Sequence, residues 1–311
     1  MKVVVFGLGK TYEKHKNEIK KKFEVIGVSS NDDKDSCLKK YIHPYDLLDM
    51  EYDNILICSE YYDAEIFHQL VDDLKIDMNK ILLHRQLFRR ETRAYSEHYE
   101  DLFIDCIFKL IGINDNITYL DLGANHPIYC SNTYRFYDRS NGGVLVEANP
   151  ELKSFIQFTR PNDILINKAI TLDGKPVRFN RLAQLGLSTV KYESINKDTL
   201  KRFPQFRIRK SYDVDGIKIN DIVNFFENGC DLLSIDLEGM DWDILQSIDF
   251  DEFRPKIVVA ETGNTEIYGQ HNRDDFTTFF NENGYCLFEN VSINSIYFDE
   301  RFKKELEDLL I

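Results

Sequence analysis

The chain has 311 residues, of which 43% are hydrophobic, and its formal net charge at pH 7 is −14. This length predicts about two domains, each with enough apolar residues to bury a core. The negative charge argues against nucleic acid as a partner, because that interaction requires a basic surface that displaces phosphate counterions.

The expected compartment follows from sequence features of targeting and redox state. No apolar run approaches the roughly 20 residues that a membrane-spanning helix requires. The opening segment, MKVVVFGLGK, does not resemble a signal peptide. The six cysteines are widely spaced, without a C-x-x-C pair or a zinc-finger pattern. We therefore expect a soluble cytoplasmic protein with reduced thiols and no membrane span.

The first predicted unit covers residues 1–88 and alternates strands with helices. Its first strand, KVVVF, leads through the turn GLGKT into a charged helix over residues 12–23. A second helix is predicted over residues 64–74, and the later strands are FEVIGVSS, NILICS and KILLH. This alternation predicts a parallel, doubly wound sheet, so we expect a small Rossmann-like α/β domain.

Residues 86–111 carry apolar side chains at helical spacing, among them Leu102, Cys106 and Leu110. We expect a helix here that leads from the first unit into the second. The boundaries predicted from this pattern are a linking helix at residues 89–116 and a second domain at residues 117–311.

The second domain opens with another strand–turn–helix start, ITYLDLGANHP. Its further predicted strands are GGVLVEAN, DILINKAI, CDLLSID and PKIVVAET, and a hairpin of GYCLFEN and NSIYFD follows. Five parallel strands followed by an antiparallel pair form the layout of a class I methyltransferase sheet. The predicted fold is therefore α/β, with a doubly wound sheet that ends in a C-terminal β-hairpin.

A ligand site is predicted beyond the carboxyl ends of the first strands of this domain, where ligands of open α/β sheets bind. Gly123 permits a sharp turn and close approach of a ligand, and Asn125 offers a side-chain amide. Glu147 ends the next strand and can accept hydrogen bonds from both hydroxyls of a ribose, and Ala169 is expected beside an adenine. We assign this site to a methyl donor, and the residues that we expect to form it are Asp121, Gly123, Ala124, Asn125, Glu147, Ala148, Ala169 and Asp236.

These residues resemble the FkbM family of methyltransferases. LDLGANHPIYCSNTYRFYDRSNGGVLVEANPEL is similar to the first two motifs of that family. DLLSIDLEGMDWDILQSIDFDEFRPKIVVAET is similar to its later D-x-E-G motif and following strand, so the resemblance covers roughly residues 117–298. It implies a class I fold, S-adenosylmethionine (SAM) as methyl donor and, typically, O-methylation of sugars or other natural products.

The resemblance assigns roles residue by residue. It implies that Asp121, Gly123, Asn125 and Glu147 contact the donor, and the D-x-E-G motif is matched by Asp236, Glu238 and Gly239. One departure is His126-Pro127 after Asn125, where many members of the family have a glycine one or two residues on.

Transfer to a sugar hydroxyl also requires removal of the acceptor proton, because a hydroxyl is a weak nucleophile. The carboxylates expected at strand ends are Asp236, Glu238 and Glu261, and the nearby loops contain His126 and His271. We assign these five residues as catalytic candidates.

Two mechanisms stay open for this set. The carboxylates and a histidine could hold Mg²⁺ or Mn²⁺, which prefer oxygen ligands, or one carboxylate could act as a general base without a metal. The bland alternative is that Glu238 and Glu261 cap helices or pair with Arg254.

Residues 191–210 form a basic stretch in an acidic protein, with seven Lys and Arg residues against Glu193 and Asp198. We assign Arg207 and Arg209 to a phosphate or carboxylate of the substrate. A small-molecule sugar or nucleotide-sugar acceptor, for instance for a bacterial surface polysaccharide, fits that assignment. The alternative is a solvated surface helix.

The first unit leaves other functions open. Gly7 and Gly9 begin like a dinucleotide fingerprint, but Tyr12 occupies the position of the third glycine. The unit could bind NAD, bind a nucleotide-linked substrate, or have a structural role that includes forming a homo-oligomer. The competing functions are accordingly an NAD-linked sugar-modifying enzyme and a non-catalytic module that binds the donor or a nucleotide.

Overall fold

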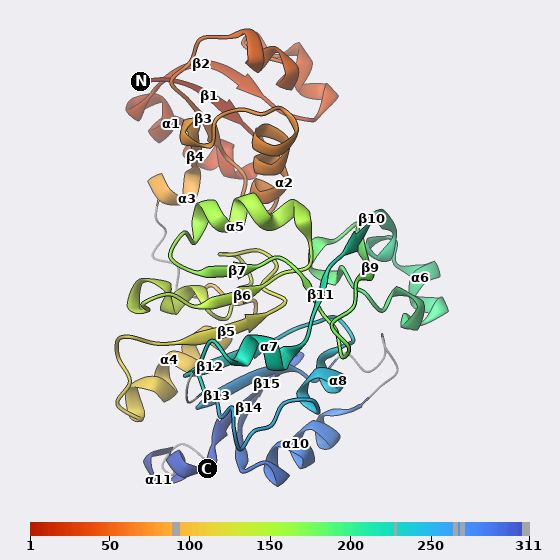
Figure 1. Ribbon diagram of the computed structural model, residues 1–311. Helices are drawn as coiled ribbons and strands as arrows, with labels where there is room; N and C mark the ends of the chain where they lie inside the picture. The colour runs from red at the N-terminus through yellow and green to blue at the C-terminus, as the bar shows by residue number, and fades with distance from the viewer. Residues whose placement is uncertain (89–93, 227–228, 264–266, 268–270, 307–311) are drawn as a thin grey trace. The chain divides into compact units, whose positions relative to one another are not determined.

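The computed structural model describes residues 1–88, 94–226, 229–263, 267 and 271–306 (Figure 1). The chain divides into two compact units, Met1–Thr92 and Arg93–Ile311. Among the described residues, none of the helices combines the length and the apolar character needed to cross a membrane.

The N-terminal unit is a four-stranded parallel sheet with strand order β2-β1-β3-β4. Its strands are β1 (Lys2–Phe6), β2 (Glu24–Ser29), β3 (Asn54–Ile57) and β4 (Ile81–Leu83). Its helices are α1 (Lys10–Lys22), α2 (Asp63–Phe67), a π-helical segment (His68–Asp73) and α3 (His84–Leu87). Val3, Val5 and Leu56 pack against Ile19 of α1. Such continuous apolar runs are typical of parallel strands that are buried on both faces.

The larger unit is built on a seven-stranded sheet with the order β14-β15-β13-β12-β5-β6-β7 (Figure 1). Five neighbouring strands are parallel, and β15 pairs antiparallel with both β13 and β14. The strands are β5 (Tyr119–Leu122), β6 (Val144–Val146), β7 (Ile164–Ile166), β12 (Leu232–Ile235), β13 (Ile257–Glu261), β14 (Tyr285–Val291) and β15 (Asn294–Asp299). This order confirms the predicted class I methyltransferase sheet with its terminal hairpin.

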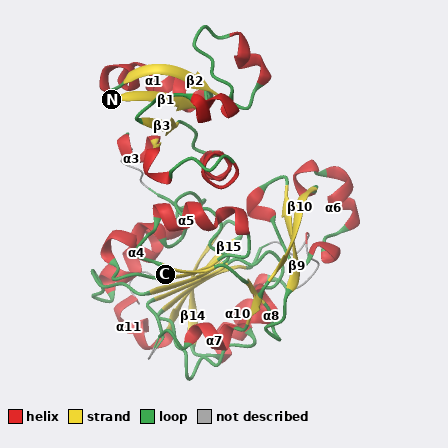
Figure 2. Ribbon diagram, turned by 45° about the horizontal axis from the view of Figure 1, so that its top comes forward, coloured by secondary structure: helices red, strands yellow, loops and turns green. Residues whose placement is uncertain are grey.

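Helices cover both faces of this sheet (Figure 2). They are α4 (Glu100–Leu110), α5 (Lys153–Thr159), α7 (Ile219–Val223), α8 (Asp241–Leu245), α10 (Arg273–Glu282) and α11 (Lys303–Leu306). Alternate strand residues, such as Leu120 and Leu122, share a core with Ile222, Ile244 and Phe280 from three of these helices. The opposite register, which includes Asp121, therefore faces the other side of the sheet.

An insertion between β7 and β12 forms two small sheets of its own. β9 (Val177–Leu182) and β10 (Ile208–Val214) make an antiparallel pair, which we call the ribbon, and α6 (Lys197–Arg202) lies between them in sequence. β8 (Ala169–Ile170) and β11 (Gly216–Ile217) make a short parallel pair.

Two predicted elements differ in extent from the observed ones. The helix expected over residues 86–111 is not continuous: α3 ends at Leu87, residues 94–99 are not helical, and α4 covers Glu100–Leu110, while residues 89–93 lie outside the described residues. The strand expected from DILINKAI is split, because β7 ends at Ile166 and Ala169 begins β8. In both cases the apolar pattern of the sequence extends beyond the residues that form the hydrogen bonds of the helix or strand.

Candidate active site

The chain leaves β5 through a turn that brings its backbone against the loop after β12. The amides of Gly123 and Ala124 donate to the carbonyl of Val146 at 2.9 and 3.0 Å. Gly123 has a φ of +84°, and a Cβ at this position would lie 1.9 Å from the carbonyl oxygen of Asp236. Only glycine fits this turn, and it leaves bare backbone at the strand ends, where a ligand can approach closely.

Glu147 lies at the carboxyl end of β6 and is 6% exposed. Its Oε2 accepts from the amide of Asn125 at 2.7 Å, and its Oε1 accepts from the amide of Asn149 at 2.6 Å. Burial raises the pKa of Glu147 to about 7. A carboxylate offers about four acceptor positions, so two backbone donors orient the group and leave capacity for hydroxyl groups of a ligand.

The loop after β5, residues 123–125, lies around this carboxylate; we call it the donor loop after its predicted role. Asn125 has a φ of +44°, which is uncommon for a residue other than glycine. A Cβ on Gly186, in the insertion, would lie 3.4 Å from Nδ2 of Asn125, so the insertion reaches the donor loop. Ala124 is buried and Ala148 is half-buried.

Ala169 lies outside the main sheet, in β8, where its amide donates to the carbonyl of Asp215 at 2.9 Å. We expected Ala169 to end a strand of the seven-stranded sheet, and this expectation is wrong. Its contact with an adenine stays a prediction. The residue that contacts the Glu147 loop from this region is Asn167, whose Nδ2 donates to the carbonyl of Glu147 at 2.7 Å.

The loop after β12 is folded around the side chain of Asp241. Oδ1 of Asp241 accepts from the amide of Leu237 at 2.8 Å, and its Oδ2 accepts from that of Gly239 at 3.3 Å. Between them Glu238 has a φ of +49°, and its carbonyl accepts the hydroxyl of Thr189 at 2.8 Å. Asp241 and Thr189 escaped sequence reasoning. Only the place of Asp241 at the start of a helix, where aspartate commonly caps, could have indicated its role.

Asp236 is the first residue of that loop. Its Oδ1 is buried and has no hydrogen-bond partner among the described residues. Burial, together with the nearby carboxyl groups of Asp241 and Asp121, raises the pKa of Asp236 to about 8. A buried polar atom without a partner is costly, and here it lies at the strand ends where a substrate of this fold binds.

Comparison with known proteins agrees with this geometry. The family model described as the methyltransferase FkbM domain matches residues 121–287, which is more than half of the chain. The chain belongs to the FkbM methyltransferase family. It is a SAM-dependent methyltransferase. A second family model, described as C2185-like, N-terminal, matches residues 1–82. No functionally curated protein matches the chain.

Solved structures similar to this FkbM methyltransferase include the methyltransferase FkbM from Methylobacillus flagellatus KT. It is 12% identical, with 96% of this chain and 89% of that one covered and a TM-score of 0.36. A TehB-like SAM-dependent methyltransferase from Corynebacterium glutamicum ATCC 13032 Kitasato is 11% identical, with 76% of this chain and 97% of that one covered and a TM-score of 0.35.

Two further catalytic candidates of the FkbM chain, Glu238 and Glu261, lie at the same edge of the sheet as Asp236. Glu261 ends β13 and is 6% exposed. Because Ile235 pairs with Ala260 in parallel register, Asp236 and Glu261 follow neighbouring strand ends. Glu238 is also buried. The structure thus brings the three predicted carboxylates to one edge of the sheet.

The two histidines are engaged elsewhere in the methyltransferase unit. Nδ1 of His126 accepts from the amides of Ile128 and Tyr129 at 3.1 and 2.8 Å, so this nitrogen holds the turn that follows the donor loop. The ring of His271 stacks on Trp242 at 3.9 Å, and its Nδ1 lies 3.6 Å from a carboxylate oxygen of Asp275. Neither observation places a histidine nitrogen against Asp236.

The sequence left open whether the carboxylates hold Mg²⁺ or Mn²⁺. In the described ranges of the FkbM chain, no three or more His, Cys, Asp and Glu side chains gather in a way that could hold a metal ion.

The basic insertion is partly neutralised by the rest of the methyltransferase unit. Glu151, in the loop after β6, lies 3.3 Å from Nε of Arg181 and 3.6 Å from Nζ of Lys210, and it also accepts the hydroxyl of Tyr212. These contacts fasten the ribbon to the loop that follows Glu147.

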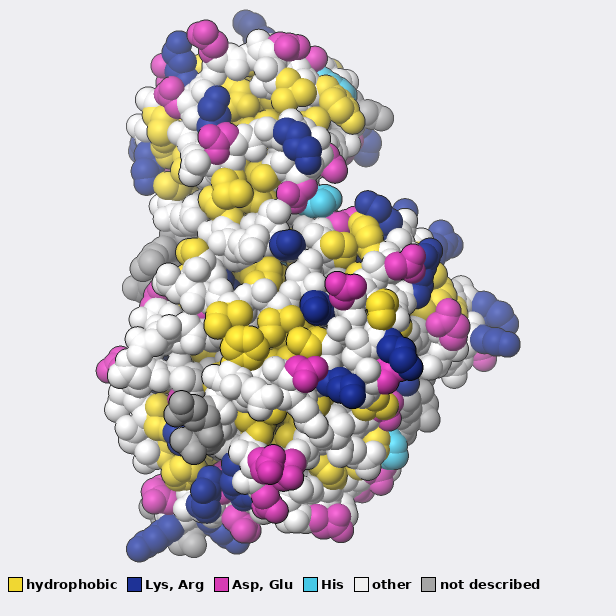
Figure 3. Space-filling model, viewed as in Figure 1, with side chains coloured by type: hydrophobic (Ala, Val, Ile, Leu, Met, Phe, Trp, Pro, Cys, Tyr) yellow, Lys and Arg dark blue, Asp and Glu magenta, His cyan; other side chains and the backbone are white. Residues whose placement is uncertain are grey.

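Arg207 and Arg209 are exposed at the start of β10. Neither has an ion-pair partner among the described residues. Figure 3 shows Lys and Arg side chains along the right-hand side of the view, where α6 and β10 lie in Figure 1. The two arginines are therefore available to an anionic ligand.

Proposed function

We propose that this enzyme transfers a methyl group from SAM to a hydroxyl group of a sugar, either nucleotide-linked or part of a surface polysaccharide. The observation that carries the proposal is the buried, unpartnered Oδ1 of Asp236 beside the donor loop. We place the reaction in the cytoplasm of a bacterium, where nucleotide sugars for such glycans are consumed.

The proposed donor seat is formed by the two strand-end loops. Gly123 gives the backbone cradle, and Glu147 accepts the ribose hydroxyls with the capacity that its two backbone donors leave free. Asp121 and Asn125 bind the amino-acid end, and Ala124, Ala148 and Ala169 line the nucleoside. When bound, SAM supplies a methyl group that is already activated toward nucleophiles, so the protein mainly aligns the acceptor and removes its proton.

Asp236 is the proposed general base. A base works best when its pKa lies near the working pH, and the pKa of Asp236 is raised to about 8. Asp241 fixes the loop that carries it. Glu238 and Glu261 bind hydroxyl groups of the acceptor from the neighbouring strand ends, while His126 shapes the donor loop.

The acceptor is proposed to carry an anionic group that Arg207 and Arg209 bind. Guanidinium groups bind phosphate and carboxylate in bidentate geometry, and both side chains are exposed. The ribbon that carries them is fastened to the donor loops by Glu151 and by Thr189, so it is well placed to present an acceptor.

The test is a screen of SAM turnover across nucleotide sugars and glycans, with and without EDTA. We expect methylation of a hydroxyl on at least one anionic sugar by the wild type, and turnover that is at least about a hundredfold slower by Asp236→Asn. Turnover restricted to amines or to non-sugar acceptors would contradict the assignment. Loss of turnover with EDTA would show that a metal ion is required, and it would contradict a general base that works without metal.

A further inference from the structure

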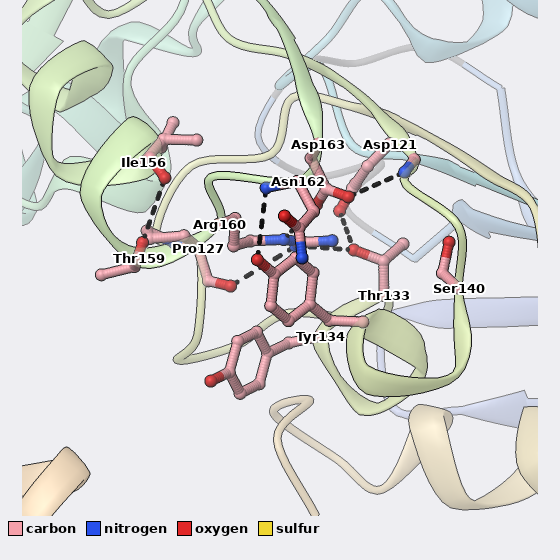
Figure 4. Close-up of polar contacts among 12 residues, drawn as sticks. Asp121, Pro127, Thr133, Tyr134, Ser140, Ile156, Thr159, Arg160, Asn162 and Asp163 are labelled. Atoms are coloured by element: carbon pink, nitrogen blue, oxygen red, sulfur yellow. Dashed lines mark hydrogen bonds and ion pairs between the residues drawn. The ribbon is translucent and has the colours of Figure 1, made fainter.

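Arg160 is a charged side chain sealed inside the methyltransferase unit. It follows α5 directly and is 1% exposed. Its Nε lies 2.6 Å from Oδ2 of Asp163, and its Nη1 donates to Oγ1 of Thr133 at 3.0 Å and to the carbonyl of Pro127 at 3.4 Å (Figure 4). A buried guanidinium is retained only at a high desolvation cost, so its partners indicate what it stabilises.

Thr133 connects this arginine to the donor site. Its hydroxyl donates to Oδ2 of Asp121 at 2.6 Å, while its oxygen accepts from Arg160 (Figure 4). Consecutive hydrogen bonds polarise one another, so the arginine strengthens the bond that Thr133 donates. The result is a relay from Arg160 through Thr133 to Asp121. The bond to the carbonyl of Pro127 ties the same arginine to the loop after Asn125.

Aromatic rings close the space around the relay. The guanidinium carbon lies 5.2, 5.9 and 5.6 Å from the ring centres of Tyr119, Tyr134 and Tyr137. The hydroxyl of Tyr119 donates to Oδ1 of Asp163 at 2.7 Å, which holds the counter-ion in place. With water excluded, the charge of Arg160 acts on Asp121 with little screening.

We propose that Arg160 is a positioning residue for the methyl donor, which through Thr133 fixes the orientation and the negative charge of Asp121. The inference rests on the proposed role of Asp121 as a contact for the positively charged end of SAM. Neither Arg160 nor Thr133 needs to touch the donor for this role.

The charges around Asp121 make the role necessary. Burial raises the pKa of Asp121, and Arg160 is the cation that opposes this effect. The other charged groups that face it are acids: Asp163 from the turn before β7, Asp236 from the loop after β12, and Glu147 at the end of β6. Without the relay, Asp121 would hold its proton to a higher pH, and a protonated carboxyl does not attract a cation.

The test compares two isosteric variants by calorimetric titration with SAM. Thr133→Val removes the relay hydroxyl. Thr159→Val removes a neighbouring hydroxyl whose hydrogen bonds, among the described residues, go to the backbone carbonyls of Phe155 and Ile156; Figure 4 shows the bond to Ile156. We expect Thr133→Val to weaken SAM binding, because a higher pKa of Asp121 leaves less of its carboxyl group ionised at a given pH. The ratio of the variant Kd to the wild-type Kd should fall toward one as the pH rises. Thr159→Val should leave the Kd unchanged.

A merely structural role gives a different result. In that case the Thr133→Val and wild-type Kd values would keep the same ratio at every pH, or the Kd would not change, and either outcome overturns the relay. A second pair guards against misfolding. Arg160→Met combined with Asp163→Asn removes both members of the buried ion pair. It should weaken SAM binding most at low pH, because Arg160 affects the pKa of Asp121 more than Asp163 does. Arg160→Lys, which keeps a cation at this position, should bind SAM more tightly than the double variant and less tightly than the wild type.

Asp121→Asn separates this inference from the proposal beneath it. If Asp121→Asn binds SAM as tightly as the wild type, Asp121 is not a donor contact, and the relay loses its purpose. If Asp121→Asn weakens binding while Thr133→Val does not, the donor contact holds and the relay alone is wrong.

Discussion

The carbonyl oxygen of Asp236 lies where a side chain on Gly123 would begin, 1.9 Å from the Cβ position. The donor loop and the loop that carries the proposed base are therefore in backbone contact. A side chain at position 123 would require the loop after β12 to shift.

Gly123→Ala should be strongly destabilising, because it combines backbone strain at a φ of +84° with a clash against Asp236. Gly112→Ala is the matched control, since Gly112 has a φ of +79° and no atom within 4 Å of its Cβ position. We expect a loss of about 1 kcal/mol for Gly112→Ala. Gly123→Ala should lose a further 1–3 kcal/mol or so from overpacking. Urea unfolding measures both, and equal losses would contradict the clash.

Glu147→Ala should abolish measurable SAM binding in calorimetry. It removes the proposed ribose acceptor and also the partner of the amides of Asn125 and Asn149, which would then be left unpaired. Glu151→Ala is a control in the same loop, because its partners lie in the ribbon. We expect Glu151→Ala to raise the KM for the acceptor and to leave SAM binding unchanged. Unchanged SAM binding by Glu147→Ala would refute the proposed SAM site.

Asp236→Asn should lower kcat by about 10²- to 10⁴-fold, the usual contribution of general base catalysis. The amide keeps the shape of the side chain but cannot accept the proton of the acceptor. Asp251→Asn, an exposed aspartate, is the control and should leave kcat unchanged. A wild-type kcat for Asp236→Asn in steady-state assays would exclude Asp236 as the base.

The raised pKa of Asp236 gives two pH dependences with opposite signs. The base must be ionised, so kcat/KM should rise about tenfold per pH unit below pH 8 and level off above it. Stability without ligand should change the other way. The folded state holds the proton more tightly than the unfolded one, so this contribution is lost as the pH rises toward 8. Asp236→Asn should therefore gain stability over the wild type between pH 4 and 8 in urea unfolding. A constant difference would contradict the shift.

Arg207→Ala combined with Arg209→Ala should raise the acceptor KM while leaving the Kd for SAM unchanged, because both side chains are exposed at the start of β10 and neither is among the predicted contacts of SAM. Arg178→Ala is the control, since Arg178 is also on the ribbon but is paired with Asp213 at 3.1 Å. The effect of the double variant should shrink at high salt. An unchanged KM in kinetics with an anionic sugar would end the assignment.

The sheet could be predicted because its information is local. Apolar runs such as IVVA before Glu261 mark each buried parallel strand, and the polar residue that ends the run lies at the carboxyl edge by the geometry of the fold. This is why Glu147, Asp236 and Glu261 could be placed at one edge from the sequence. The split of DILINKAI could not, because both halves are apolar and only the hydrogen-bond partner differs.

The relay and the ribbon contacts could not be predicted for a different reason. Arg160 reaches Thr133 across 27 residues, and Thr189 reaches Glu238 across 49. Neither side chain has a periodicity or a motif that marks it, and an arginine after a helix is ordinarily a solvated residue. Likewise the sequence predicts His126 as a catalytic candidate, but it could not indicate that its Nδ1 accepts from two backbone amides.

The ribbon forms its hydrogen-bonded ladder apart from the main sheet. In the part of the chain that the structure describes, β9 and β10 pair with each other and not with the seven-stranded sheet. The ladder of the main sheet therefore imposes no register on residues 177–214, which are held by side-chain and loop contacts such as those of Glu151 and the carbonyl of Glu238. Substitutions on the exposed face of the ribbon can therefore change the surface that it offers to an acceptor without disturbing the strand pairing of the seven-stranded sheet.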